Sequence, residues 1–147
     1  MSRPYLLTKP DGTKQWFLNN KLHRLDGPAV ETPEGSRCWY YRGLNHRVNG
    51  PAIEYADGSR VWFYYGALHR LDGPAIYYTE IFGDNHYGWY INGNKMSEEK
   101  FNKVMSICKK VIIKFKTALR RKYISVLKET NTCDEVFLYN IISAYMI

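Results

Sequence analysis

One phrase of seven residues occurs three times in this chain, and its spacing constrains the fold more than any other feature. The copies begin at His23, His46 and His69 and read His-Arg-Leu-Asp-Gly-Pro-Ala, His-Arg-Val-Asn-Gly-Pro-Ala and His-Arg-Leu-Asp-Gly-Pro-Ala. Each copy starts 23 residues after the previous one. A fixed period of roughly 20 to 50 residues is typical of an array of one supersecondary unit. The sequence therefore predicts a repeat architecture over residues 1–97.

Each unit carries the signals of two strands and two turns. An acidic residue and a glycine form the first turn, and a tryptophan follows that glycine by four residues: Asp11-Gly12 with Trp16, Glu34-Gly35 with Trp39, and Asp57-Gly58 with Trp62. The tryptophans open aromatic runs, which favour strands. Asparagine and glycine, which tolerate the positive φ of tight hairpin turns, follow these runs. A second strand follows each Gly-Pro-Ala step.

The second strand of each unit alternates between apolar and other residues. One face carries Val30, Ile53 and Ile76, and the other carries the alanines that precede them in sequence. A period of two with larger apolar residues on one side indicates a sheet with that face packed. We therefore expect an antiparallel meander of about seven or eight strands, in which each unit contacts mainly its neighbours.

The regular spacing breaks once. Trp62 and Trp89 are 27 residues apart, four more than the period allows, and the surplus falls in residues 79–88. Insertions in repeat proteins map to loops and often to a binding face, so Phe82, His86 and Tyr87 are candidate partner-binding residues. A tolerated surface insertion is the other interpretation, because lengthening a loop adds little closure entropy.

The pattern changes from strands to helices at Ser97. Ser97 is suited to cap a helix, and two glutamates follow in the first turn, where the helix dipole favours negative charge. Apolar residues then recur at helical spacing to about Lys128, which predicts a long amphipathic helix. A second helix is expected from Thr132 to the end, because Thr132 and Glu135 fit a capping box. We expect these C-terminal helices, residues 98–147, to pack on or cap the sheet, or to form a homodimer.

The positive charge of the chain lies mainly in these predicted helices. The net charge is +7, and residues 98–147 contribute ten Lys and Arg against five Asp and Glu. Opposite the apolar stripe, Lys103, Lys110, Lys114, Arg121 and Lys128 return to similar angles on a 3.6-residue helix. Such a stripe fits a nucleic acid or a nucleotide, with Lys110, Lys114 and Arg121 as candidate contacts. A solvated helix face has the same composition.

The three histidines invite a metal or catalytic interpretation, which their spacing disfavours. Equivalent positions of successive hairpins lie two strands apart, about 10 Å, whereas zinc ligands lie about 2 Å from the metal. An enzyme site also needs unlike groups that converge on one point, and the chain lacks the Gly-x-Ser-x-Gly, His-Glu-x-x-His and phosphate-loop motifs. We therefore predict no catalytic residues, no metal and no cofactor.

The repeated His-Arg pairs have two remaining interpretations. The phrase fits turn chemistry, in which the Asp or Asn side chain bonds local backbone and the glycine supplies the bend. The exposed rows of the pairs His23-Arg24, His46-Arg47 and His69-Arg70 could also form a binding stripe, so these six residues are candidate partner-binding residues.

The cysteines and the apolar segments of the sequence indicate the cellular compartment of the protein. Cys38, Cys108 and Cys133 are odd in number and have no Cys-x-x-Cys spacing, so we expect reduced thiols. The N-terminus lacks the apolar segment of a signal peptide, and no run approaches the roughly 18 apolar residues of a membrane span. We expect a cytoplasmic protein that does not enter a membrane.

The hairpin units resemble a known class of repeats. Trp39-Tyr40-Tyr41-Arg42-Gly43 and Trp89-Tyr90-Ile91-Asn92-Gly93, joined to His-Arg-x-Asp/Asn-Gly-Pro-Ala, are similar to MORN-like β-hairpin repeats. They resemble in particular the variant of phage, giant-virus and bacterial proteins related to YwqK-type antitoxin-like repeat proteins, over about residues 10–97. The resemblance implies a non-catalytic scaffold, with host takeover or inhibition of a bacterial defence as its expected setting.

The expected fold class is thus α+β, an antiparallel hairpin-repeat meander over residues 1–97 followed by helices over residues 98–147. The expected function is binding of a protein partner by the hairpin array. Sequestration of an anionic ligand, either nucleic acid or a signalling nucleotide, by aromatic and basic side chains is the alternative.

Overall fold

The computed structural model describes residues 3–79 and 86–122. The chain divides into two compact units, Met1–Ser97 and Glu98–Ile147. Within the described residues, the first unit is an antiparallel β meander and the second contains one helix, so the fold class is α+β. The expected second helix from Thr132 lies outside the described residues.

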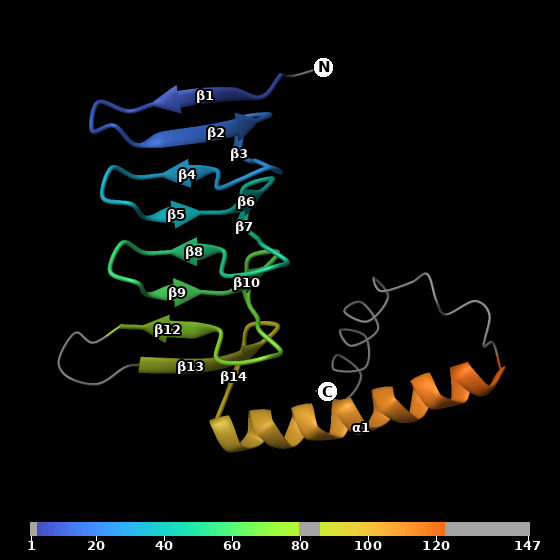
Figure 1. The fold of residues 1–147 in the computed structure, drawn as a ribbon. Helices are drawn as coiled ribbons and strands as arrows, with labels where there is room; N and C mark the ends of the chain where they lie inside the picture. Colours follow the sequence, from blue (N-terminus) through green and yellow to red (C-terminus); the bar gives the residue numbers. More distant parts are fainter. Residues whose placement is uncertain (1–2, 80–85, 123–147) are drawn as a thin grey trace. The chain divides into compact units, whose positions relative to one another are not determined.

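One large sheet organises the first unit (Figure 1). Its strands within the described residues follow the order β1-β2-β4-β5-β8-β9-β12-β13-β14, and β3 pairs with β2. The strands are β1 Tyr5–Thr8, β2 Lys14–Leu18, β3 Lys21–Leu22, β4 Val30–Glu31, β5 Arg37–Cys38, β8 Ile53–Glu54, β9 Arg60–Val61, β12 Ile76–Tyr78, β13 His86–Ile91 and β14 Asn94–Met96. Neighbouring strands are antiparallel throughout, and the hairpin turns lie along one side of the sheet (Figure 1).

Two short hairpins stand apart from the large sheet. They are formed by β6 Tyr40–Tyr41 with β7 Leu44–Asn45, and by β10 Phe63–Tyr64 with β11 Ala67–Leu68. Their turns contain Arg42-Gly43 and Tyr65-Gly66, all four with positive φ. The glycines predict these turns, whereas the residue types of Arg42 and Tyr65 do not predict a positive φ. Backbone bonds from Gly43 N–H to Leu22 O and from Gly66 N–H to Asn45 O join each hairpin to the preceding one, at 2.8 Å in both cases.

The chain bends at Trp39 and Trp62, where the sequence predicts continuous strands. Trp39 N–H donates to Ala52 O of the large sheet at 2.8 Å, and Trp39 O accepts from His46 N–H of the short hairpin at 3.1 Å. Trp62 makes the matching bonds to Ala75 and His69. Because the two polar groups of one residue bond to different sheets, each predicted aromatic strand divides into two. The prediction of seven or eight strands is therefore wrong, and the strands are shorter and more numerous.

The core of the first unit differs from the predicted packed face. Ala29, Ala52 and Ala75 are completely buried, whereas Val30 and Ile53 on the opposite face are only half-buried. The alanines follow a Gly-Pro step, and each alanine carbonyl accepts a hydrogen bond from the backbone N–H of a tryptophan: Trp16, Trp39 and Trp62 in turn. Val61, Ile91 and Met96 complete the buried apolar set of the described part of this unit.

The second unit begins with α1, Glu98–Lys122. The helix starts directly after Ser97, as predicted, and Glu98 and Glu99 lie in its first turn. Phe101, Met105 and Cys108 are buried, at the spacing of one helix face. The expected continuation to about Lys128 lies outside the described residues. No helix in the described ranges has an apolar stretch long enough to cross a membrane.

Candidate functional site

The arginine of each repeated phrase stacks on a tryptophan. The guanidinium carbon of Arg47 lies 3.7 Å from the centroid of Trp39, and Arg70 lies 3.8 Å from Trp62. Arg24 lies 4.1 Å from Trp16. A planar guanidinium over an indole face gains cation–π and dispersion energy. Arg47 and Arg70 therefore lie over the bends at Trp39 and Trp62, and Arg24 lies over Trp16 of β2.

The same arginines donate to acceptors later in the loop and, for Arg24 and Arg47, in the strand that follows. Arg47 Nη1 donates to Pro51 O at 3.1 Å and to Glu54 Oε1 at 2.8 Å. Arg24 donates to Pro28 O at 3.3 Å and Arg70 to Pro74 O at 3.2 Å. The backbone carbonyl fixes the guanidinium in the loop, so the arginine ties the loop to the strand that follows.

The carboxylates around each arginine differ. Arg24 pairs with Asp26 at 3.0 Å and with Glu31 at 3.4 Å, whereas Arg70 pairs with Asp72 at 2.7 Å. The hydrogen bond from the arginine holds the pKa of Asp26, and likewise that of Asp72, below its ordinary value. The main partner of these aspartates is thus the arginine side chain, and the predicted bond to local backbone is secondary.

The glycine of the phrase lies against the arginine side chain. A Cβ on Gly27 would lie 3.1 Å from Arg24 Cζ, and one on Gly73 would lie 3.1 Å from Arg70 Cζ. Of the three equivalent glycines, Gly50 alone has a positive φ, of 146°. The chain does bend at Gly27 and Gly73, but without a positive φ, and the close approach of the guanidinium leaves little room for a side chain there.

The histidines accept hydrogen bonds from later turns: His23 and His46 from the turns of the two short hairpins, and His69 from the turn between β13 and β14. Nδ1 of His23 accepts from Arg42 N–H at 3.1 Å, and Nδ1 of His46 accepts from Tyr65 N–H at 3.2 Å. Nδ1 of His69 accepts from Asn92 N–H at 3.1 Å. An acceptor at Nδ1 requires the neutral ring with its proton on Nε2. Each histidine therefore stabilises a turn whose donor residue has positive φ.

The histidine and tyrosine rings alternate along the short hairpins. Ring centroids are 5.0 Å apart for His23 and Tyr41, 6.0 Å for Tyr41 and His46, and 5.7 Å for Tyr64 and His69. The rings form a row and do not converge. Among the described residues, no group of three or more His, Cys, Asp or Glu is placed to hold a metal ion.

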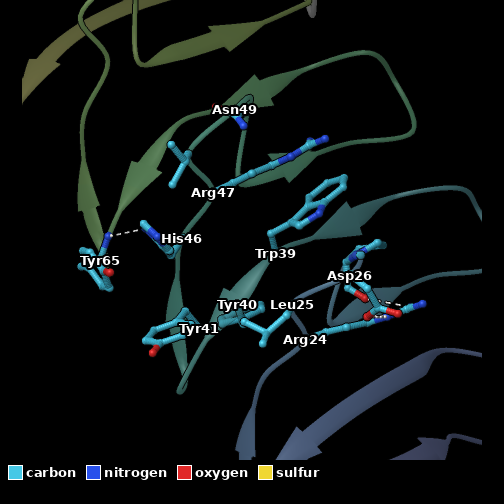
Figure 2. A pocket seen from close by; sticks show the side chains of 13 residues that line it. Arg24, Leu25, Asp26, Trp39, Tyr40, Tyr41, His46, Arg47, Asn49 and Tyr65 are labelled. Carbon is cyan, nitrogen blue, oxygen red and sulfur yellow. Dashed lines mark hydrogen bonds and ion pairs between the residues drawn. The ribbon is translucent and has the colours of Figure 1, made fainter. Parts of the chain in front are cut away.

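An open groove lies between the first two arginine loops, which we define as residues 23–29 and 46–52, with 69–75 as the third. Its volume is about 720 Å³. Figure 2 shows Arg47 extended along Trp39 and the hydrogen bond from the backbone of Tyr65 to His46. The apolar part of the lining comes from Leu25, Trp39, Tyr40, Tyr41, Val48 and Tyr65. Polar and charged side chains also line the groove: Arg24, Asp26, His46, Arg47 and Asn49. The groove is therefore mixed in character, and its arginines already have partners.

The residue after each arginine is aliphatic, and in the first two loops it is exposed. Leu25 is 81% exposed and Val48 is 54% exposed, while Leu71 is half-buried. We call these three residues the aliphatic row. Tyr65, which is 49% exposed, lies beside the row in the lining of the groove. An apolar side chain kept at an exposed position contributes little to the core, so the row is a candidate contact surface.

The remaining candidates of the sequence lie elsewhere. His86 and Tyr87 are exposed on β13, and the Tyr87 ring lies 5.6 Å from the Tyr77 ring on the paired strand. Phe82 lies outside the described residues. Lys103, Lys110 and Lys114 are exposed on α1, and these three side chains form no ion pair within the described part of the chain. Arg121 lies on α1, but its side chain is outside the described set.

Sequence reasoning missed the residues that hold the arginines. Trp16, Trp39 and Trp62 each precede the stacked arginine by eight residues, and Glu31 and Glu54 each follow theirs by seven. These constant spacings were the available signal. The aliphatic row was also missed, although the residue between the arginine and the aspartate or asparagine is Leu, Val and Leu in the three phrases.

Comparison of the chain with protein-family models, with curated proteins and with solved structures finds no match.

Proposed function

We propose that this protein is a non-catalytic binding protein whose hairpin array engages a protein partner through the aliphatic row and the adjoining groove. The exposure of Leu25 and Val48 carries the proposal, because an aliphatic side chain at these loop tips gains little from folding. Desolvation of such a row by a partner would provide the affinity. The tyrosine and tryptophan rings that line the adjoining groove belong to the residue types enriched among the hot spots of protein interfaces.

The interactions of the histidines and arginines support a scaffold role. Each arginine is engaged by a tryptophan face and a backbone carbonyl, and each histidine by a backbone N–H. General acid–base or nucleophilic work needs groups free to meet a substrate. These side chains instead fix the loops that present the aliphatic row, which supports a binding function over an enzymatic one.

The family and setting remain part of this proposal. We infer that the unit is a MORN-like, YwqK-type hairpin repeat of 23 residues. The matching backbone bonds of Trp39 and Trp62, 23 residues apart, support this assignment. Under it, the protein is a phage or viral factor that acts in the host cytoplasm on a host or defence protein.

The test uses photo-crosslinking amino acids at positions 25 and 48, with Tyr55 as the control position. Tyr55 is 40% exposed and lies in the turn between β8 and β9, away from the arginine loops. We expect one partner to crosslink from positions 25 and 48 and not from position 55. With that partner purified, Leu25→Asp and Val48→Asp should each weaken binding at least tenfold, and Tyr55→Asp should not. Equal crosslinking from all three positions would reject the proposal.

A second candidate function rests on α1. Its exposed Lys103, Lys110 and Lys114 recur on one face and are compatible with binding of an anionic ligand. The test is oligonucleotide binding as a function of salt, because counterion release makes phosphate binding fall steeply as salt rises. Replacing Lys110, Lys114 and Arg121 by Glu should abolish binding. Unchanged affinity in that variant would reject this candidate.

A further inference from the structure

The strand at one end of the large sheet presents an unusually apolar surface. All four residues of β1 are exposed, with exposed fractions of 48% for Tyr5, 49% for Leu6 and 47% for Leu7. Within the described residues, β1 pairs with β2 alone, and it forms the end of the sheet order (Figure 1). An uncovered edge strand offers a row of main-chain donors and acceptors to another strand.

The pairing of β1 with β2 determines which residues face the free edge. Lys9 N–H donates to Thr13 O at 2.9 Å, in continuation of the register that pairs Leu7 with Gln15. Residues that exchange hydrogen bonds with one neighbour alternate along an antiparallel strand. Tyr5, Leu7 and Lys9 therefore use their main chain toward β2. Leu6 and Thr8 direct their N–H and C=O groups to the free edge.

The side chains of β1 differ from those at the matching positions of the inner strands. Leu6 occupies the position of Ala29, Ala52 and Ala75, which are completely buried. Thr8 occupies the position of Glu31 and Glu54, each of which pairs with an arginine. Natural edge strands commonly carry a charge that repels a second strand. Residues 5–8 carry none, so β1 lacks this protection.

Prolines restrict the free edge without closing it. Pro4 and Pro10 lie two residues before Leu6 and two residues after Thr8, at positions of the same parity. Proline has no N–H, so it cannot donate to an added strand. The free edge thus offers donors at Leu6 and Thr8, and any partner strand is limited to this short stretch.

We propose that β1 is a homodimerisation strand, which pairs antiparallel with β1 of a second copy around a two-fold axis at Leu7. In this register, Leu6 faces Thr8 of the second copy and Thr8 faces its Leu6, and each pair exchanges two hydrogen bonds. Leu7 then lies opposite itself as a non-hydrogen-bonded pair, with Cα atoms about 4.5 Å apart. Pairing consumes the free edge of both copies, so the assembly closes as a dimer.

A second copy is favoured as the occupant because β1 is complementary to itself. Its two outward residues satisfy each other in the two-fold register, and no charge is brought together within residues 5–8. Stable interfaces bury about 1,200–2,000 Å² in total, more than a pair of four-residue strands supplies. The dimer is therefore expected to dissociate on dilution. This inference does not depend on the proposed function, which concerns the arginine loops.

The first test is disulfide trapping under mild oxidation, with any purification tag at the C-terminus. Leu7→Cys should form a covalent dimer, because disulfides need Cα atoms about 4.4–6.8 Å apart. Tyr5→Cys is the matched control, since position 5 faces position 9 of the second copy and lies far from its own counterpart. Both variants retain the native cysteines, so the wild-type chain provides the baseline. Equal dimer yields from the two variants would overturn the proposal.

The second test is sedimentation velocity over about a hundredfold range of protein concentration. The wild-type chain should shift from monomer to dimer as concentration rises. Leu6→Pro removes an N–H that faces the free edge, and Leu6→Lys adds a charge there, so both variants should remain monomeric with unchanged circular dichroism. A wild-type chain that stays monomeric throughout, or that forms species larger than a dimer, would reject two-fold pairing through β1.

Discussion

His46 and Tyr65 contact each other in two ways. The backbone N–H of Tyr65 donates to Nδ1 of His46 at 3.2 Å, and the two rings are stacked with centroids 4.0 Å apart and planes 16° from parallel. Tyr65 has a φ of 46°, a conformation that is unfavourable for a bulky residue. The ring stack and the hydrogen bond together compensate for that backbone cost and join two successive short hairpins.

The histidine bonds make stability depend on pH. Burial lowers the pKa of His46 and of His69 below the ordinary value of 6.5. A protonated ring would also turn Nδ1 into a donor facing a backbone N–H. Because the folded pKa lies below the unfolded one, the stabilisation is complete above about pH 6.5 and declines as pH falls below it. We expect the free energy of unfolding, measured by urea titration, to decrease from pH 7 to pH 5.

The double variant His46→Asn/His69→Asn is the control for this dependence. The asparagine Oδ1 can accept the same backbone N–H and does not titrate, so the slope between pH 7 and pH 5 should flatten although the ring stack is lost. Asp26 and Asp72 also have lowered pKa values, but their effect lies below about pH 4. An equal slope in the double variant and in the wild-type chain would show that His46 and His69 do not cause the pH dependence of stability.

Much of the fold could be predicted from the sequence, because its signals are local. The turn glycines and the period of two predict hairpins, and Ser97 with its two glutamates predicts the start of α1. The bends at Trp39 and Trp62 could not be predicted in this way. An aromatic run looks the same whether its residues bond to one sheet or to two, and only the distant partners distinguish these cases.

The candidate site was harder to predict because its contacts join residues distant in sequence. His23 and His46 bond to donors 19 residues later, at Arg42 and Tyr65, which share no side-chain chemistry. His69 bonds to Asn92, 23 residues later, so the four inserted residues are accommodated without loss of this bond. Side-chain patterns cannot identify a backbone donor. The rows of His and Arg therefore looked like free surface groups.

Arg47 is expected to stabilise the fold through its shape as well as its charge. A lysine at this position keeps the charge but cannot lie flat on Trp39 while bonding to both Pro51 O and Glu54. We expect Arg47→Lys to lower the free energy of unfolding by about 1–3 kcal/mol in urea titrations. Arg60→Lys, at an exposed position on β9, should change it by less than about 0.5 kcal/mol. Similar losses of unfolding free energy in both variants would show that the stacking on Trp39 and the hydrogen bonds to Pro51 O and Glu54 add no specific stability.

Alanine substitutions at the turn glycines Gly43 and Gly66 distinguish the cost of backbone strain from the cost of side-chain crowding. Their φ values are 87° and 82°, so alanine at either position should cost about 1–2 kcal/mol from the backbone alone. A Cβ on Gly66 would also lie 3.3 Å from Leu44 Cδ2, whereas one on Gly43 meets Lys21 at 3.6 Å. Gly66→Ala should therefore lower the thermal midpoint more than Gly43→Ala does. In a Leu44→Ala background the two costs should become equal, and a difference that persists would exclude Leu44 as its cause.

The burial of the alanines limits the size of the side chain that the inner strands tolerate at these positions. Ala52 is completely buried, and its carbonyl accepts the Trp39 N–H at the bend, so added methyl groups would enter the interior and not solvent. We expect Ala52→Val to destabilise the protein by about 1–3 kcal/mol through overpacking. Ala56→Val, at an exposed turn position, is the matched control and should be nearly neutral. Urea titration of both variants measures the difference. If Ala52→Val is also neutral, the bend does not require a small side chain. The presence of Ala52 in an inner strand and of Leu6 at the matching position of β1 would then have another cause.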